Sequence, residues 1–176
     1  MRKVSGILVG LAALAGAGCV HEDKSVAPRG TAAVTAEVTI FEGADGKPTF
    51  RYNGPFFDEK GNFDFSQEGA KFNTINLTFA IADGSIPGLK FRADPRDAIW
   101  IVEKAKADPE TGSPVGPYRG DQFVDFRVTD DGRRLTLTDK NDDGVLYRYG
   151  LRFNHDAALV ADDPDGQNGP KFCPNC

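Results

Sequence analysis

Hydrophobic and polar residues alternate with a period of two over much of the chain. The first alternating segment has its apolar side chains at Val34, Ala36, Val38 and Ile40. A second has them at Ile75, Leu77, Phe79 and Ile81. This period places every second side chain on the same face of a β-strand, as a half-buried strand requires. Shorter apolar runs predict further strands at 49–52, 89–92 and 99–103, and a phenylalanine-rich loop separates the first of these from the strand at 75–82.

The C-terminal third carries the clearest strand pattern. Strands are predicted at 123–129, 133–138 and 145–154, separated by two segments that each contain Asp-Gly. Asp-Gly favours tight turns, because Gly accepts positive φ and Asp bonds to nearby backbone N–H groups. We therefore expect a three-stranded meander. On its last strand, Val145, Tyr147, Tyr149, Leu151 and Phe153 would share the core face.

After the N-terminal leader, no stretch of ten residues has the apolar spacing of an amphipathic helix. Eight to nine strands without helices predict two packed antiparallel sheets. The expected fold is an all-β, immunoglobulin-like or cupredoxin-like β-sandwich over residues 34–165, followed by a tail at 166–176.

The run LTLTDKNDDGVLYRYGLRF, followed by DDPDGQNG, resembles the end of small bacterial immunoglobulin-like or cupredoxin-like domains. Such domains include the DP-EP family and, more distantly, the AidA/PixA inclusion-body proteins. The matching positions are Leu135, Leu137, Asp139, Asn141, Tyr147, Tyr149, Leu151, Asp163, Pro164 and Asn168. The resemblance covers about 35 of the 176 residues. It implies a β-sandwich and assigns no activity.

The first 18 residues have the pattern of an export signal. Arg2 and Lys3 precede an apolar stretch that falls short of the ~20 residues needed to cross a bilayer. The sequence LAGAGC ending at Cys19 resembles the lipobox of bacterial lipoproteins, with Gly16 where a branched aliphatic residue is usual. We expect Cys19 to be lipidated, with ordinary secretion after Ala17 as the alternative.

Residues 19–33 are polar or small and predict a flexible tether to the membrane. The expected location is the cell envelope, with the domain facing the periplasm or anchored in the outer membrane. Loss of the leader leaves 19 basic against 26 acidic residues, a net charge of about −7. Such a chain repels phosphate backbones, so no nucleic-acid partner is expected.

Two further cysteines, Cys173 and Cys176, occur in the sequence C-P-N-C. No βαβ pattern surrounds them, and the chain lacks the partners of a four-ligand zinc site. We expect a small structural disulfide formed in an oxidising compartment.

Candidate catalytic residues are scarce. His21 and His155 are the two histidines, and no G-x-S-x-G sequence accompanies them, which disfavours a Ser-His-Asp hydrolase. Whether the protein is an enzyme stays open, because paired carboxylates of a glycosidase-like hydrolase have no distinguishing sequence signal.

Asp139, Asn141 and Asp143, followed by Gly144, match the first half of an EF-hand calcium loop. The twelfth position is Gly150, where the loop requires a bidentate glutamate. Ca²⁺ is thus the one cofactor that the sequence suggests, but the pattern favours a polar turn, and we expect no calcium effect.

The remaining candidates for function are Trp100, Phe56 and Phe57, aromatic residues that would suit stacking on a sugar or contact with a protein. Loop aromatics that pack beneath the sandwich are the alternative. The sequence therefore predicts a non-catalytic binding or envelope-associated module with an unidentified glycan or protein partner, and a secreted hydrolase as the alternative.

Overall fold

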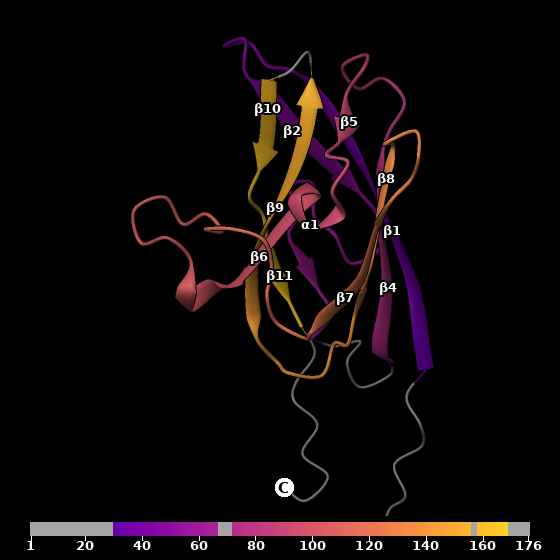
Figure 1. Cartoon of the computed structure of the whole chain (residues 1–176), viewed down its shortest axis with the longest axis vertical. Helices are drawn as coiled ribbons and strands as arrows, with labels where there is room; N and C mark the ends of the chain where they lie inside the picture. The colour runs from indigo at the N-terminus through magenta and orange to yellow at the C-terminus, as the bar shows by residue number, and fades with distance from the viewer. Residues whose placement is uncertain (1–29, 67–71, 156–157, 169–176) are drawn as a thin grey trace, which may run out of the picture.

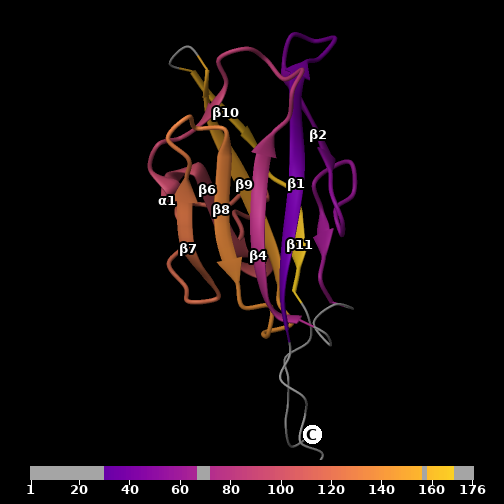
Figure 2. The same cartoon turned by 90° about the vertical axis from the view of Figure 1, so that its right-hand side faces the viewer.

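One face of the molecule is a five-stranded sheet with the order β2-β1-β4-β8-β7. The computed structural model describes residues 30–66, 72–155 and 158–168. The strands of this first sheet are β1 (Gly30–Glu42), β2 (Pro48–Asn53), β4 (Phe72–Ile81), β7 (Phe123–Val128) and β8 (Arg134–Asp139). Figure 2 shows these strands side by side, with the strands of the second sheet behind them.

The second sheet is built around the long strand β9 (Leu146–His155). One edge of β9 pairs first with β10 (Ala158–Asp162) and then with β11 (Asp165–Gln167), which also pairs with β3 (Phe63–Asp64). The other edge pairs with β5 (Lys90–Phe91) and β6 (Ile99–Glu103). Figure 1 shows these strands with the one-turn helix α1 (Pro95–Ala98) that precedes β6. A short 3₁₀ turn, η2 (Lys104–Lys106), follows β6.

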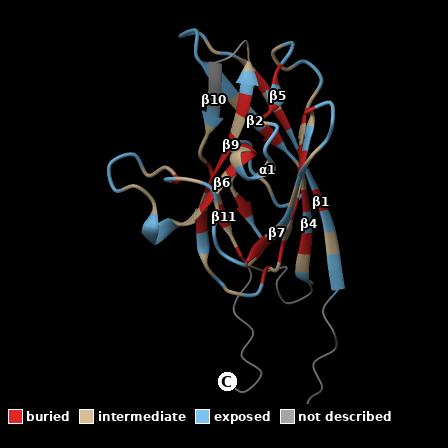
Figure 3. Cartoon of the chain, in the orientation of Figure 1, coloured by how far each residue is buried: buried red, intermediate tan, exposed pale blue. Residues whose placement is uncertain are grey.

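The core lies between the two sheets (Figure 3). The inward positions of β1, β4 and β9 are those that the alternating pattern predicted, and they are almost fully buried. Val145, predicted on the same face, precedes β9 and is half-buried. The ring of Tyr149 in β9 packs at a tilt against those of Phe63 and Phe79, with centroids 5.6 and 5.5 Å away. Its hydroxyl donates to the Gly61 carbonyl at 2.5 Å, so the buried ring has its polar atom satisfied.

The predicted all-β sandwich is confirmed, with two differences in its sheets. Both sheets are mixed, because β1 runs parallel to β4 and β11 runs parallel to β3. Eleven strands occur in the described part of the chain, against the eight to nine predicted. The predicted loop at 56–65 supplies the two-residue strand β3, and β10 and β11 follow the last predicted strand. No helix among the described residues is long and apolar enough to span a membrane.

The predicted meander is wrong at its second turn. β7 and β8 form a hairpin, but β8 pairs with β4 on its other edge, so both of its edges are occupied. The chain therefore crosses at 140–145 to the second sheet, where β9 becomes the central strand. Asp139, at the crossing, is fully buried.

Candidate functional site

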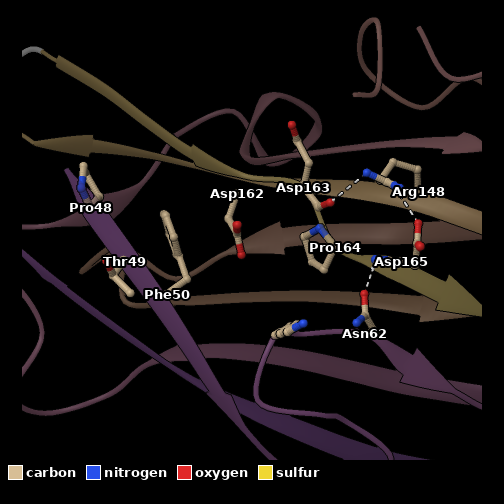
Figure 4. Close-up of a pocket in the computed structure, with 10 residues that line it drawn as sticks. Pro48, Thr49, Phe50, Asn62, Arg148, Asp162, Asp163, Pro164 and Asp165 are labelled. Carbon is tan, nitrogen blue, oxygen red and sulfur yellow. Dashed lines mark hydrogen bonds and ion pairs between the residues drawn. The ribbon is translucent and has the colours of Figure 1, made fainter. Parts of the chain in front are cut away.

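A polar groove of about 470 Å³ opens between β2, the turn at 58–62 and the segment that joins β10 to β11. Figure 4 shows the side chains that converge on it. The groove is lined by Pro48, Thr49, Phe50, Lys60, Asn62, Arg148, Asp162, Asp163, Pro164 and Asp165.

Asp162 lies at the centre of the groove, with Phe50 on the opposite wall (Figure 4). The hydroxyl of the buried Tyr52 donates to Asp162 Oδ2 at 2.9 Å and fixes the carboxyl group. Burial raises the pKa of Asp162, although this hydrogen bond opposes the rise.

Arg148 organises the neighbouring wall. Its Nε donates to Asp165 Oδ1 at 2.6 Å and its Nη1 to the Asp163 carbonyl at 3.3 Å. Lys104 Nζ contacts the other oxygen of Asp165 at 2.7 Å. Asp165 thus has two cationic partners, and its charge is compensated within the protein.

Asp163 is directed away from Asp162 (Figure 4), as adjacent residues of an extended chain are. Its Oδ2 accepts a hydrogen bond of 2.5 Å from the Ser113 hydroxyl. The two neighbouring carboxylates therefore do not face each other across the groove.

The floor of the groove is set by the turn at 58–62. Asn62 Nδ2 donates to Asp58 Oδ2 at 2.8 Å, and Asn62 Oδ1 accepts from the Asp165 backbone N–H at 2.9 Å. Lys60, on the same turn, makes no ion pair with another described residue and is exposed. The groove thus presents the exposed ammonium group of Lys60 and the carboxyl group of Asp162, which Tyr52 holds in place and which forms no ion pair with another described residue.

A second cluster surrounds Asp139. Its Oδ1 accepts hydrogen bonds from Gln122 Nε2 at 3.0 Å, the Asn141 backbone N–H at 2.9 Å and Asn168 Nδ2 at 3.1 Å. Burial is the largest cause that raises the pKa of Asp139, to about 7, and the charge of Asp143 adds to it. Asp139 Oδ2 and Asn168 Oδ1 are both buried without a hydrogen-bond partner among the described residues.

Asp143 is half-buried beside this cluster. Its Oδ1 accepts from the Val145 N–H at 3.0 Å and from Asn168 Nδ2 at 3.3 Å, while Oδ2 accepts from the Tyr147 hydroxyl at 2.5 Å. The amide of Asn168 therefore bridges the two carboxylates.

The three candidate calcium ligands do not all face one point. Asp139 and Asp143 share Asn168, but Asn141 Nδ2 donates to the Phe72 carbonyl at 3.1 Å. Within the described ranges, no group of three or more His, Cys, Asp or Glu residues is placed to hold a metal ion. The absence of a calcium effect stays a prediction.

The aromatic candidates lie in different places. Phe57 packs against Phe63 and Phe79 of the core, with ring centroids 5.5 and 5.8 Å away. Phe56 remains 39% exposed. Trp100 is covered by Arg152, whose Cζ lies 3.6 Å from the centre of the indole ring. No ring contact among the described residues joins Trp100 to either phenylalanine, so the three form no single stacking surface.

Cys19, Cys173, Cys176 and His21 lie outside the described residues, and His155 ends β9. No family model matches the chain, and no curated protein is detectably similar to it.

Sequence reasoning missed Tyr52, Asn62 and Arg148 as groove residues. No local signal identifies them, because their partners are 110, 103 and 17 positions away. Asn168 was a position of the resemblance, but nothing in the sequence pointed to its bridging contact.

Proposed function

We propose that this protein is a lipid-anchored, non-catalytic binding module of the cell envelope, and that its groove takes a hydroxyl-rich ligand of the glycan class. The observation that carries the proposal is the set of fixed donors and acceptors around an open groove. Sugar hydroxyls both donate and accept hydrogen bonds, so they suit carboxyl, amide and ammonium groups placed side by side.

The walls of the groove support a ligand of this kind. Phe50 is half-buried on one wall and offers an apolar surface for the C–H face of a sugar ring, opposite Asp162. Asp162 and Asn62 are held by Tyr52 and Asp58, so little side-chain freedom would be lost on binding. Specific sites commonly combine such apolar walls with a few polar groups in fixed positions.

The carboxylates favour binding over hydrolysis. Glycosidases place two carboxyl groups on opposite sides of the scissile bond. Here Asp162 and Asp163 point in opposite directions (Figure 4), and Asp165 is occupied by Arg148 and Lys104. Asp139 has a raised pKa, as a general acid needs, but it is fully buried and cannot touch a substrate.

The proposed location in the cell envelope rests on the N-terminal sequence. After loss of an 18-residue leader, an acylated Cys19 and the residues up to 29 would tether the sandwich to a membrane, whereas residues 30–33 of the predicted tether belong to β1. Mass spectrometry of the protein purified from its native membrane should find a chain that begins at an acylated Cys19. A chain that begins at Gly18 without acyl mass would contradict the anchor.

Calorimetric titration with soluble peptidoglycan fragments and neutral oligosaccharides tests the groove. We expect saturable binding by the wild type, at least tenfold weaker binding by Asp162→Asn, and unchanged binding by Asp142→Asn. Asp142 is the matched control because it is exposed and lies outside the groove. Equal binding by all three proteins, or binding by none, would contradict the proposal.

A further inference from the structure

Two buried oxygen atoms in the Asp139 cluster accept no hydrogen bond from a described residue. Asp139 Oδ2 and Asn168 Oδ1 have no partner in the described part of the chain, and both residues are 0% exposed. The two side chains are already joined by the 3.1 Å bond from Asn168 Nδ2 to Asp139 Oδ1. A buried acceptor without a donor is destabilising, and here two such acceptors belong to one bonded pair.

The orientation of the Asn168 amide is fixed by its surroundings. Its Nδ2 donates to Asp139 Oδ1 and Asp143 Oδ1, at 3.1 and 3.3 Å. The reverse orientation would set the amide oxygen against two carboxylate oxygens. The amide oxygen is therefore the atom that needs a donor, and turning the amide does not supply one.

The charges around Asp139 do not compensate an ionised carboxylate. From the flanking strands, Ile75 of β4 and Phe123 of β7 lie opposite it. The charged group facing it is Asp143, which repels a second negative charge. Tyr147 already gives its hydrogen to Asp143.

No positively charged side chain among the described residues compensates the Asp139 carboxyl group. Neither Asp139 nor Asp143 forms an ion pair with a described Lys, Arg or His, and the remaining contacts of Asp139 come from neutral amides and a backbone N–H.

We propose that Asp139 carries a proton on Oδ2 and donates it to Asn168 Oδ1, so that the two side chains form a two-bond acid–amide pair that latches the end of β11 to the end of β8. On ionisation the proton passes to water, and Asp139 Oδ2 then faces Asn168 Oδ1 with no hydrogen between them. The bond from Asn168 Nδ2 remains, but half of the pair is lost. The raised pKa of Asp139, about 7, agrees with a neutral acid in mildly acidic surroundings.

The latch connects to the groove through β11. Asn168 directly follows this three-residue strand, and Asp165 at its start forms the groove wall with Arg148. Loss of the proton thus loosens the strand that carries Asp165. The latch itself does not depend on what the groove binds.

A cation between the same two oxygens is the competing explanation. Asp139 Oδ1 already accepts three hydrogen bonds, and both oxygens of Asp143 also accept hydrogen bonds. This leaves only two oxygens without a partner, far from the six or more that calcium takes. A proton satisfies both atoms with a single hydrogen.

The variant Asp139→Asn tests the latch, because its amide supplies the hydrogen permanently. Denaturant unfolding should be followed from pH 4 to pH 8.5 for the mature wild type, Asp139→Asn and the control Asp142→Asn. The folded pKa near 7 exceeds the usual aspartate value, so the stability from the proton is complete below about pH 4 and is lost as the pH rises to about 7. The unfolding midpoint of Asp139→Asn should therefore rise relative to wild type between pH 4 and 7 and stay constant above. A difference that does not change with pH would overturn the proposal.

A measurement on the wild type tests the latch even if the Asp139→Asn variant does not fold. The ¹³C signal of the Asp139 carboxyl group should titrate with a midpoint near 7. A carboxylate that is already ionised at pH 5 would overturn the latch. Stabilisation of the wild type by calcium at pH 8, absent in Asp139→Asn and reversed by a chelator, would replace the proton with a cation.

Discussion

Two aspartate-rich segments, 139–143 and 162–165, look alike in the sequence and differ in chemistry. The first contains a fully buried carboxyl group surrounded by amides, whereas the second lines an open groove. In the groove, Tyr52, Ser113, Arg148 and Lys104 each direct a hydrogen at a carboxylate. In the buried cluster, Asp139 Oδ2 has no such donor. The comparison shows that two similar acidic segments acquire different chemistry from their surroundings, with burial as the largest cause that raises the pKa of Asp139.

The largest effect is expected for Asp139→Ala. This change removes the acceptor of Gln122 Nε2 and of the Asn141 N–H, and one of the two acceptors of Asn168 Nδ2, in a buried site. Each abandoned donor is destabilising, and together they should lower the free energy of unfolding by about 3–5 kcal/mol. Urea unfolding measures it, with the exposed Asp142→Ala as a control that should change stability by less than about 0.5 kcal/mol. Similar losses in both variants would mean that the buried bonds contribute little.

A smaller effect is expected for Arg148→Met in the groove. Met retains part of the apolar stem but removes the bonds to Asp165 Oδ1 and the Asp163 carbonyl. Because Asp165 keeps Lys104 as a partner, the loss of stability should be about 1–3 kcal/mol. Binding of a groove ligand should weaken in parallel. Unchanged stability would show that the Arg148 contacts do not organise this wall.

A still smaller effect is expected for Lys104→Met, which removes the other partner of the same carboxylate. The Lys104 side chain is 44% exposed, against 23% for Arg148. An exposed ion pair contributes about 0–1 kcal/mol, so this variant should lose less stability than Arg148→Met under the same conditions. The reverse order would contradict the assignment of Arg148 as the organising cation.

The smallest effect is expected from calcium. Millimolar calcium should leave the melting temperature unchanged, because Gly150 replaces the bidentate glutamate and Asn141 donates to Phe72. A calcium-dependent rise that Asp143→Ala abolishes would make the 139–143 segment a metal site and remove the contrast between the two segments.

Local patterns predicted most of the strands. Strand pairing and the site residues depend on contacts between distant segments, which local patterns do not encode. The period of two placed Val34 to Ile40 and Tyr147 to Phe153 in the core correctly, because alternation directly encodes which face is buried. The meander failed because the sequence does not show that β4 already occupies the free edge of β8. The site residues depend on pairs such as Tyr52 with Asp162 and Asp139 with Asn168, which no spacing rule links.

A residue-resolved NMR titration tests the central claim, ligand binding in the groove, most directly. The isotope-labelled mature protein would be titrated at constant pH with soluble peptidoglycan fragments and neutral oligosaccharides. We predict saturable shifts of the amide signals of Thr49, Lys60, Asn62 and Asp163, with the signals of Gln122 and Asn141 unchanged. Shifts centred on the buried cluster or elsewhere on the sandwich, or no shifts with any of these ligands, would contradict the account.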